Sequence, residues 1–376
     1  MPDAPRLISR RSLLRSTLGG GSALLAAYLI GCADGGDATP TPTPAPTLAK
    51  PTPQPEPTPT PSVLRWQQLS PSGPLPPPRR DHSLVLGEMP DPRLVLFAGR
   101  SGSGDLADLW TFDLASGGWT EVQASPGPAP RHGHNAIWDV ATERLVIFGG
   151  QQGSTFLNDI WEFDLRSNEW GQLPNSGSGP TPRYGAAAAL TFGPADPAGR
   201  LLVTHGFTNA GRFDDTWAYG LSMESWTDAS PSGQRPVERC LMRGVWDSRS
   251  NRLLMFGGQT TGTPFLGDLW ALTVAGWQEI VTDLKPLPRT FYSFVFDVEA
   301  GRAILYGGNT QDGPANDLWY FDSASETWER QEAGAGPSPR RGHDAVWHPD
   351  SRSLLVFGGN DGASDLNDLW ELSVPL

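Results

Sequence analysis

The sequence predicts an all-β domain built as a closed ring of six similar units. A repeat of about 51 residues fills residues 64–376. Two tryptophan series recur with this period, one in an Asp-x-Trp phrase (Trp110, Trp161, Trp217, Trp270, Trp319, Trp370) and one after it (Trp66, Trp119, Trp170, Trp226, Trp277, Trp328). Short apolar runs separated by turn residues indicate strands, and no segment has convincing helical periodicity. A closed ring of small sheets usually binds something on its axis.

Each unit contains four strand signals. The first is a short apolar run after a Pro-Arg phrase, as at residues 136–138. The second is a continuous apolar run that ends in glycine, as at 145–148, and its continuity indicates burial on both faces. The third follows the Asp-x-Trp phrase, as at 109–114, and the fourth carries the second tryptophan, as at 119–122. We therefore expect each unit to form one four-stranded blade.

The two ends of the repeat region predict how the ring closes. The region begins with a fourth strand at residues 64–69 and ends with a third strand at 369–374. Six copies of every strand exist only if the N-terminal strand completes the last blade. That pairing removes the free sheet edges that would otherwise aggregate. We expect a six-bladed β-propeller closed in this way.

The repeat resembles the kelch repeat. In the second unit the resemblance is carried by Gly149-Gly150, by Asp159 and Trp161, and by Trp170. Six copies agree at several positions each, and the departures are few: Ala98-Gly99 and His205-Gly206 replace Gly-Gly, and a longer phrase at 236–239 replaces Pro-Arg. The resemblance implies a kelch-type propeller, distantly similar to the central domain of galactose oxidase. It also implies that the loops after Pro-Arg and after Gly-Gly open on one face around the central channel.

Residues 1–31 are predicted to be an export signal. Four arginines precede an apolar stretch at 18–30 that is short for a permanent membrane span. Residues 9–15 resemble a twin-arginine motif, and residues 29–32 resemble a lipoprotein signal-peptidase box that would place a lipid on Cys32. The alternative is an ordinary signal peptide with a chance cysteine. The expected location is the outer face of the cytoplasmic membrane, the periplasm or the cell surface, with the membrane leaflet left open.

Residues 32–61 are predicted to be a disordered spacer. This Thr/Pro-rich segment carries prolines at nearly every second position, and proline removes the amide donors that helices and sheets need. At about 3.1 Å per residue the segment could reach on the order of 80 Å. It would hold the propeller, residues 62–376, away from a lipid anchor.

The charge of the chain excludes several partners. The net charge is −13, and removing residues 1–31, with four Arg and one Asp, makes it −16. Nucleic acid and anionic lipid would be repelled, so we expect no nucleic-acid partner and membrane contact only through the lipid anchor. Cys240 is the one cysteine left after lipidation, so an internal disulfide is not possible and a buried, inert thiol is expected. We expect a monomer.

Internal symmetry separates scaffold residues from candidate site residues. Charged residues present in all six units are predicted to support the blades: Arg79, Arg131, Arg183, Arg239, Arg289 and Arg340; Arg93, Arg144, Arg200, Arg252, Arg302 and Arg352; Asp108, Asp159, Asp215, Asp268, Asp317 and Asp368. The tryptophans are predicted to pack between blades, and His82, His134 and His343 to be structural.

Two sets of residues vary between units and form the candidate ligand site. The first ring follows Pro-Arg: Arg80, His132, Tyr184, Cys240, Thr290 and Arg341. The second ring follows Gly-Gly: Arg100, Gln151, Phe207, Gln259, Asn309 and Asn360. Except for Cys240 and Phe207, these side chains suit hydrogen bonding to sugars, peptide backbones or carboxylates. The alternative for the carboxamides is that they cap turns. Arg80 and Arg341 are expected to be neighbours that contact the ligand.

A binding module for a carbohydrate or a protein is the favoured function, without cofactor, metal or catalytic residue. The best enzymatic alternative is a sugar-active enzyme similar to the exported six-bladed sialic acid mutarotases, which need an acid or base that the sequence does not locate. His132, Tyr184 and Cys240 on consecutive units raise a copper site of galactose oxidase type, but a second histidine and a second tyrosine are not evident. Residues 279–287 lack the histidine of the iron-binding kelch motif. Fold analogy does not choose the ligand.

Overall fold

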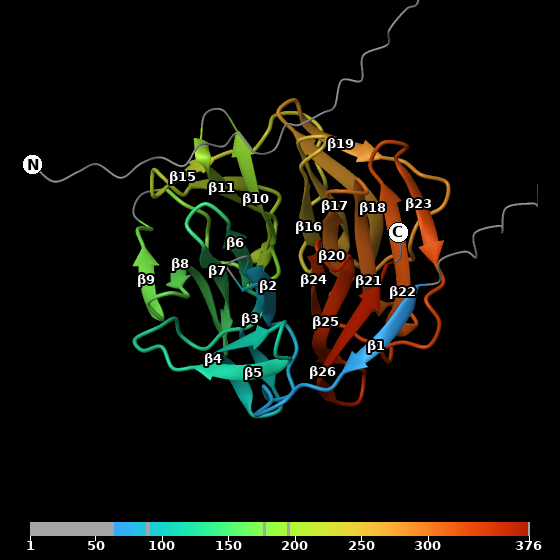
Figure 1. The fold of residues 1–376 in the computed structure, drawn as a ribbon. Coiled ribbons are helices and arrows are strands. Elements are labelled where there is room, and N and C mark those ends of the chain that lie inside the picture. The colour runs from blue at the N-terminus through green and yellow to red at the C-terminus, as the bar shows by residue number, and fades with distance from the viewer. Residues whose placement is uncertain (1–63, 88–90, 176–177, 194–195, 375–376) are drawn as a thin grey trace, which may run out of the picture. The chain divides into compact units, whose positions relative to one another are not determined.

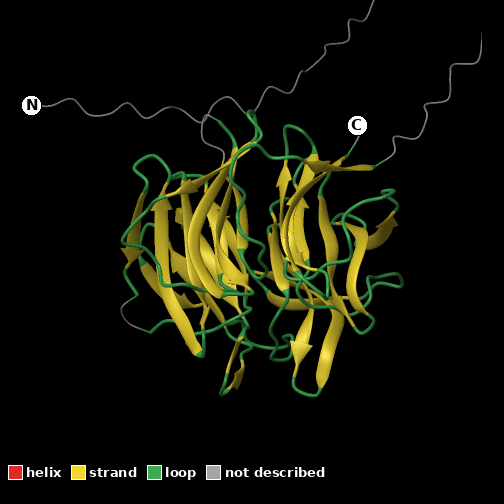
Figure 2. Cartoon of the chain, turned by 90° about the horizontal axis from the view of Figure 1, so that it is seen from below, coloured by secondary structure: helices red, strands yellow, loops and turns green. Residues whose placement is uncertain are grey.

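The computed structural model describes residues 64–374 apart from 88–90, 176–177 and 194–195. The predicted signal peptide, Cys32 and the spacer lie outside the described residues. Within the described ranges the chain consists of strands and loops (Figures 1 and 2). None of these residues forms a helix long and apolar enough to cross a membrane.

Six four-stranded antiparallel sheets surround an axis, and the prediction of a six-bladed propeller is confirmed. Blade 1 consists of β2 (Ser83–Gly87), β3 (Arg93–Ser101), β4 (Gly104–Asp113) and β5 (Gly118–Val122). Blade 2 consists of β6 (Asn135–Asp139), β7 (Arg144–Gln152), β8 (Thr155–Asp164) and β9 (Glu169–Leu173). Blade 3 consists of β10 (Ala187–Gly193), β11 (Asp196–Thr204), β14 (Thr216–Gly220) and β15 (Ser225–Asp228). Blade 4 consists of β16 (Arg243–Asp247), β17 (Arg252–Thr260), β18 (Thr263–Thr273) and β19 (Gly276–Ile280). Blade 5 consists of β20 (Ser293–Asp297), β21 (Arg302–Thr310), β22 (Gly313–Asp322) and β23 (Thr327–Gln331). Blade 6 consists of β24 (Asp344–His348), β25 (Ser353–Asn360), β26 (Asp365–Ser373) and the N-terminal strand β1 (Arg65–Leu69). A short hairpin, β12 (Phe207–Thr208) with β13 (Gly211–Arg212), extends the tip of blade 3.

The first strand of every blade lies next to the axis. In Figure 1 the labels of β2, β6, β10, β16, β20 and β24 gather at the centre, and each of these strands contacts the first strands of the neighbouring blades. The second, third and fourth strands follow outward, each antiparallel to the one before. The hairpins between second and third strands therefore all point to one face, which we call the axial face.

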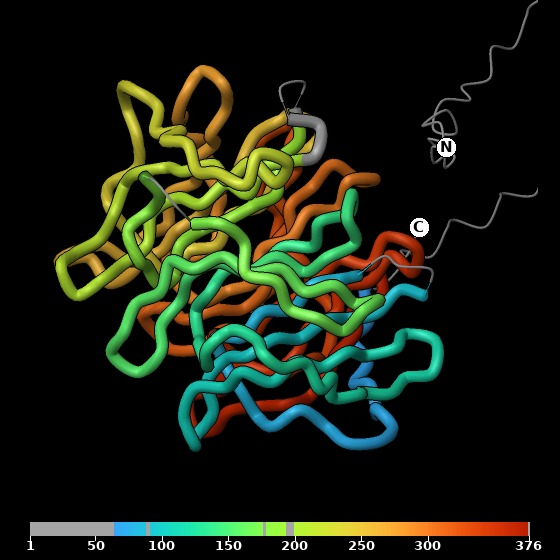
Figure 3. Tube along the Cα trace, turned by 90° about the vertical axis from the view of Figure 1, so that its left-hand side faces the viewer, coloured from blue at the N-terminus to red at the C-terminus, as the bar shows by residue number. Residues whose placement is uncertain are grey.

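The N-terminal strand closes the ring. β1 pairs antiparallel with β26 from Arg65 opposite Ser373 to Leu69 opposite Leu369. Figures 1 and 3 show the blue β1 beside the red strands of blade 6. Trp66 of β1 packs on Tyr306 of blade 5, with ring centroids 5.0 Å apart. The predicted closure is confirmed, and it is secured by backbone pairing and by side-chain packing together.

The core lies between blades, as the continuous apolar runs predicted. One cluster joins Leu96 and Phe112 of blade 1 with Leu355 and Phe357 of blade 6. The second tryptophan of each blade packs on a ring of the preceding blade, as Trp119 does on Phe357 at 5.1 Å between centroids. The other pairs are Trp66–Tyr306, Trp170–Phe97, Trp226–Phe148, Trp277–His205 and Trp328–Phe256. Each blade is thereby fixed on its neighbour by aromatic contact.

The six-fold arginines of the Pro-Arg phrase are confirmed as scaffold. Each is fully buried and donates two parallel hydrogen bonds of 2.6–2.9 Å to the aspartate of its own blade's Asp-x-Trp phrase. In blade 2 Arg131 also donates to the carbonyl of Gly149, and Asp159 accepts a bond from Trp161. The phrase therefore ties the loop between blades to the third strand. The second arginine series has no common partner: Arg144 meets Glu162, whereas Arg302 meets Asp297.

Candidate functional site on the axial face

The two predicted rings meet on the axial face. Each residue of the first ring forms a backbone bridge with the residue of the second ring in the same blade: Arg80 with Arg100, His132 with Gln151, Tyr184 with Phe207, Cys240 with Gln259, Thr290 with Asn309, and Arg341 with Asn360. The bridges fix the two loops of every blade against each other. The structure thus brings all twelve residues to one face, as the resemblance implied.

A closed circle of backbone hydrogen bonds surrounds the axis beneath these rings. It is formed by the residues that directly follow the first ring: Asp81, Gly133, Gly185, Leu241, Phe291 and Gly342. Each amide donates to the carbonyl of the equivalent residue in the preceding blade, at 2.7–3.1 Å, and the circle closes from Asp81 to Gly342. All six have left-handed backbones with φ between 54° and 64°. Asp81, Leu241 and Phe291 bear the steric cost of this conformation, whereas glycine does not.

Replacing a glycine of this circle should destabilise the domain. A Cβ on Gly133 would lie 1.9 Å from Cε2 of Tyr184, so Gly133→Ala must displace the Tyr184 ring. We expect a loss of about 2–4 kcal/mol, from positive φ and overpacking together. Gly153→Ala is the matched control in the same blade, because Gly153 has φ of +54° and open space around it. Chemical denaturation should show the larger loss for Gly133→Ala, and equal losses would refute the packing role of the circle.

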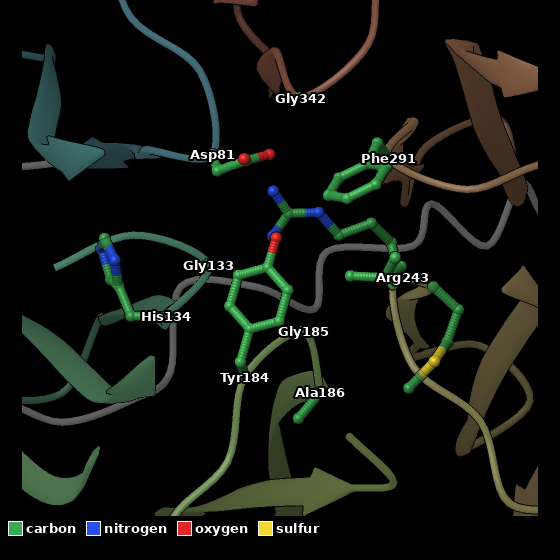
Figure 4. A pocket seen from close by; sticks show the side chains of 11 residues that line it. Asp81, Gly133, His134, Tyr184, Gly185, Ala186, Arg243, Phe291 and Gly342 are labelled. Atoms are coloured by element: carbon green, nitrogen blue, oxygen red, sulfur yellow. The ribbon is translucent and has the colours of Figure 1, made fainter. Parts of the chain in front are cut away.

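The circle leaves a small cavity on the axis. Its volume is about 30 Å³, and Asp81, Tyr184, Phe291 and Arg243 line it. Figure 4 shows Arg243 extending into the cavity toward the carboxylate of Asp81. This volume is enough for about two water molecules. Ligand pockets for small molecules are usually roughly ten times larger.

The cavity combines a buried acid with several cations. Burial raises the pKa of Asp81 to about 6, against the opposing charges of Arg80, Arg243 and Arg341. Arg243 approaches Asp344 at 3.7 Å, and Asp344 accepts a bond from the Leu84 amide.

The other titratable groups near the cavity are neutral at pH 7. Burial, and secondarily the charge of Asp81, raises the pKa of Tyr184 well above 10.0. Burial, followed by the charge of Arg131, lowers the pKa of His134 well below its usual value. Charge at the axis therefore comes from carboxylates and guanidinium groups.

Asp81 should make stability depend on pH. Its folded-state pKa is above the ordinary 3.8, so the folded protein binds more protons than the unfolded chain between these values. The contribution of Asp81 is greatest below pH 4 and falls by up to about 3 kcal/mol as pH rises to 6. Other aspartates, such as Asp159, have lowered pKa values, so their contribution to stability rises with pH. The effect of Asp81 is therefore isolated by comparing the stability of wild type with that of Asp81→Asn at each pH. Unfolding from pH 4 to 7 should show wild type losing stability relative to this variant, and parallel curves would contradict the assignment.

Arg80 has a partner that the sequence did not identify. Its Nη1 donates to both carboxylate oxygens of Asp365, at 2.6 and 2.8 Å. The sequence predicts that Arg80 contacts the ligand; in the structure its charge is paired with Asp365, because the hairpin of blade 6 reaches across the blade boundary. An equivalent contact joins His132 Nδ1 to Asp105 at 2.8 Å between blades 2 and 1.

Arg341 is the ring cation with the weakest internal partner. Its Nη1 lies 3.4 Å from Oδ1 of Asn309, and no described carboxylate lies within 4 Å of it. Arg100 is 46% exposed and 3.9 Å from Asp105. These two guanidinium groups are the ones most available to a ligand.

Several of the other predicted residues serve the fold. Gln151 donates to the carbonyl of Gly153, and Asn360 donates to Asp365 and accepts from Gly362, so these carboxamides cap turns. Cys240 is buried, and burial raises the pKa of its thiol, in keeping with an inert cysteine. Thr290 is buried as well. Gln259 and Asn309 remain partly exposed on the face.

Sequence reasoning missed Arg243, Asp344, Asp81, Asp105 and Asp365. Arg243 and Asp344 could have been found by comparing equivalent positions between the six units. The first residue of the innermost strand reads Ser83, Asn135, Ala187, Arg243, Ser293 and Asp344, so blades 4 and 6 alone carry charge there. In the described part of the chain no three His, Cys, Asp or Glu side chains converge as a metal site.

Comparison with known proteins places these features in context. The model of the KLHDC2/KLHL20/DRC7 Kelch-repeats domain matches residues 60–246 and 221–375. The chain is 30% identical over 336 residues to an F-box/kelch-repeat protein of Arabidopsis thaliana, covering 77% of the chain and 67% of that protein. It is 29% identical over 245 residues to the leucine-zipper-like transcriptional regulator 1 homolog of Drosophila melanogaster, covering 60% and 24%. The host cell factor homolog hcf-1 of Caenorhabditis elegans is 26% identical over 269 residues, covering 64% and 33%. The chain thus spans between a quarter and two thirds of the length of these relatives.

Proposed function

This chain belongs to the kelch-repeat family, and on that premise we propose that it is a binding propeller whose axial face holds a protein partner. Kelch propellers generally bind proteins. The observation that carries the proposal is the contrast between the closed axis and the polar face around it. The axial cavity of about 30 Å³ is lined by groups that already face one another, so it does not admit a sugar or a cofactor. Recognition therefore occurs on the face around the axis rather than in the axial cavity.

The polarity of the face supports a protein partner of mixed chemistry. Near blades 6, 1 and 2 the face carries Arg80 with Asp365, His132 with Asp105, and the freer Arg100 and Arg341. Toward blades 2 and 3 it carries aromatic side chains, with Phe156 and Phe207 in edge contact at 5.7 Å between centroids. Protein interfaces commonly combine aromatic and apolar contacts with polar groups and arginine.

The position of the N-terminal strand supports a tethered propeller. Arg65 begins β1 opposite Ser373, at the end of β26 that is remote from the ring residue Asn360. We therefore include in the proposal the lipoprotein signal at residues 1–31, the lipid on Cys32 and the spacer at 32–61. Such a tether would attach at the end of blade 6 that is remote from the ring residues and would leave the axial face uncovered. Cys32→Ala should move the full chain from the detergent phase to the aqueous phase of a Triton X-114 extraction.

A carbohydrate ligand is the second candidate, and one groove favours it. The groove lies between blades 6 and 1, has a volume of about 550 Å³, and is lined by Arg80, Ser101, Ser103 and Asn360 among others. Hydroxyl, amide and guanidinium groups hydrogen-bond sugars well. Thermal unfolding of residues 62–376 with N-acetylneuraminate or glucuronate tests this candidate. A stabilisation that Arg80→Ala removes would favour the sugar over the protein.

Affinity capture from the cell envelope tests the protein partner. Immobilised residues 62–376 should retain specific proteins, and Arg100→Ala/Arg341→Ala should reduce their recovery at least about tenfold. The matched control is Arg65→Ala/Arg330→Ala, which removes two exposed arginines from the outermost strands β1 and β23. Equal recovery by wild type and both double variants would overturn the assignment of the axial face.

A further inference from the structure

A groove at the outer part of the axial face, between blades 4 and 5, departs from the polar chemistry of the rings. Its volume is about 410 Å³. Pro264 and Phe265 at the tip of blade 4 line one side, Leu287 and Pro288 of the connection between the blades form part of the wall, and Gln311 and Asp312 at the tip of blade 5 line the other side. We call it the 4/5 groove.

The equivalent groove between blades 6 and 1 is lined by charged and polar side chains, unlike the more apolar 4/5 groove. There the connection supplies Pro77 and Pro78, and the hairpin residue equivalent to Phe265 is Asp365. Asp365 is neutralised by Arg80, so the 6/1 groove has an internal ion pair. At the boundary between blades 4 and 5 Phe265 stands in place of the acid, and the position of Arg80 is taken by Thr290, which is buried and does not line the groove. A residue that differs from most of its equivalents in this way can serve a ligand that binds off the axis; blade 2 carries Phe156 at the same position.

The connection between blades 4 and 5 exposes large apolar side chains. Leu287, which lines the groove, is 57% exposed, and Leu284 and Val281 of the same connection are exposed as well, although they do not line it. Scattered exposed leucines are ordinary, but several on one short segment beside an apolar groove mark an interaction surface. Covering these side chains removes apolar area from water, which favours association.

Arg341 of blade 6 does not line the groove but lies beyond its blade 5 side. Thr310, which lines the groove, follows Asn309, and Asn309 lies 3.4 Å from Nη1 of Arg341. No described carboxylate lies within 4 Å of Arg341, so its charge is not neutralised by a salt bridge within the domain. A guanidinium group in this state pairs well with a carboxylate of a ligand.

We propose that the 4/5 groove holds an extended segment of the partner protein, with a leucine-sized apolar side chain in the groove and a neighbouring carboxylate against Arg341. The inference deepens the proposed function and rests on it. Charge complementarity decides the occupant: Arg341 forms no salt bridge with a described carboxylate, and Leu287 and the partly exposed Phe265 have apolar surface left uncovered. A purely basic or purely polar segment would leave one of the two without a partner.

Selection of random peptides displayed on phage against purified residues 62–376 tests the chemistry directly. We expect enrichment of sequences with Asp or Glu near Leu, Ile, Met or Phe. A synthetic peptide from the enriched set should bind Leu287→Ser about tenfold more weakly than wild type, as expected for loss of one central apolar contact. Replacing its acid by the amide should weaken binding to wild type and have little effect on Arg341→Ala.

Val298→Ser is the matched control, because Val298 is 54% exposed and lies in the turn between β20 and β21, at the opposite end of blade 5. Its peptide affinity should equal that of wild type, and both serine variants should unfold at the wild-type temperature. Enrichment without acid and apolar residues, no enrichment, or equal affinity for Leu287→Ser would overturn the proposal. A second copy of the chain as occupant would appear as a dimer in sedimentation that Leu287→Ser dissociates, and would also overturn it.

Capture from the envelope separates this inference from the proposed function. If Arg100→Ala/Arg341→Ala loses the captured partner and Leu287→Ser keeps it, the axial face is the binding face and the groove proposal is wrong. If both variants keep it, both proposals are wrong. Loss by both variants, with Val298→Ser unaffected, is the result expected.

Discussion

A chain that begins at Ser70 is expected to lose cooperative folding, whereas a chain that begins at residue 62 should fold like the full-length protein. Removing β1 deletes five pairs with β26 and leaves that strand as a free edge. It also removes Leu64 and Trp66 from a core cluster shared by blades 5 and 6. The loss of one buried and one partly buried large side chain alone costs up to roughly 5–10 kcal/mol. That exceeds much of the stability of a typical domain.

Calorimetry and sedimentation of the two truncated chains check this expectation. The 62–376 chain should show one unfolding transition and a monomer. The 70–376 chain should show a broad or absent transition and concentration-dependent association through the exposed β26. A synthetic peptide of residues 62–69 added in excess should restore the transition, because β1 is held by non-covalent pairing. An unchanged transition in the shorter chain would show that five complete blades support the sixth without it.

The second large effect is expected from Arg289→Met. Arg289 is fully buried and donates bonds of 2.6 and 2.7 Å to the carboxylate of Asp317 and one of 2.8 Å to the carbonyl of Gly307. Its removal leaves Asp317 largely buried beside an apolar side chain. Breaking such a pair from one side costs about 3–5 kcal/mol. Guanidinium chloride unfolding should show this loss as a lower midpoint with an unchanged slope.

A double-variant cycle separates the pair from the packing. Burial opposes ionisation of Asp317, but the hydrogen bonds and charge of Arg289 outweigh it and lower the pKa of this carboxyl. Adding Asp317→Asn to Arg289→Met should therefore recover part of the stability, since the neutral amide tolerates burial without a cation. Arg330→Met, on an arginine that is 60% exposed, should change stability by less than about 0.5 kcal/mol. Additive losses in the cycle would show that the two groups do not stabilise each other.

The axial face unites a rigid frame with a variable surface. The arginine and aspartate pairs occur in every blade and hold the connections that carry the first ring. The ring residues on these connections differ from blade to blade. In blade 1 the first-ring residue is Arg80, which pairs with Asp365 of blade 6, whereas in blade 5 it is the buried Thr290. A partner that covers the face would meet charge near blades 6 and 1 and apolar groups near blades 4 and 5. This division is the physical basis of both functional proposals.

The sequence by itself determined the number of blades, the strands within them and the closure of the ring. These follow from local features: apolar runs define buried strands, and the count of tryptophan phrases leaves one strand to be supplied from the N-terminus. The scaffold roles of Arg131 and Asp159 were also predictable, because every unit repeats them in the same place. The meeting of the two rings on one face was implied by the resemblance to kelch propellers, and in the structure each ring residue bridges its counterpart within one blade.

Only the tertiary structure decided which side chains face the axis and which cross a blade boundary. Arg80 reaches Asp365 from 285 positions away, and His132 reaches Asp105 of the blade before. Such contacts depend on the tilt between consecutive sheets, which no spacing within one unit records. The same holds for the closed circle through Asp81 and Gly133, where six left-handed residues meet only because the ring is closed. Packing between blades, rather than any single repeat, therefore sets the small volume of the axial cavity and leaves the face as the surface for recognition.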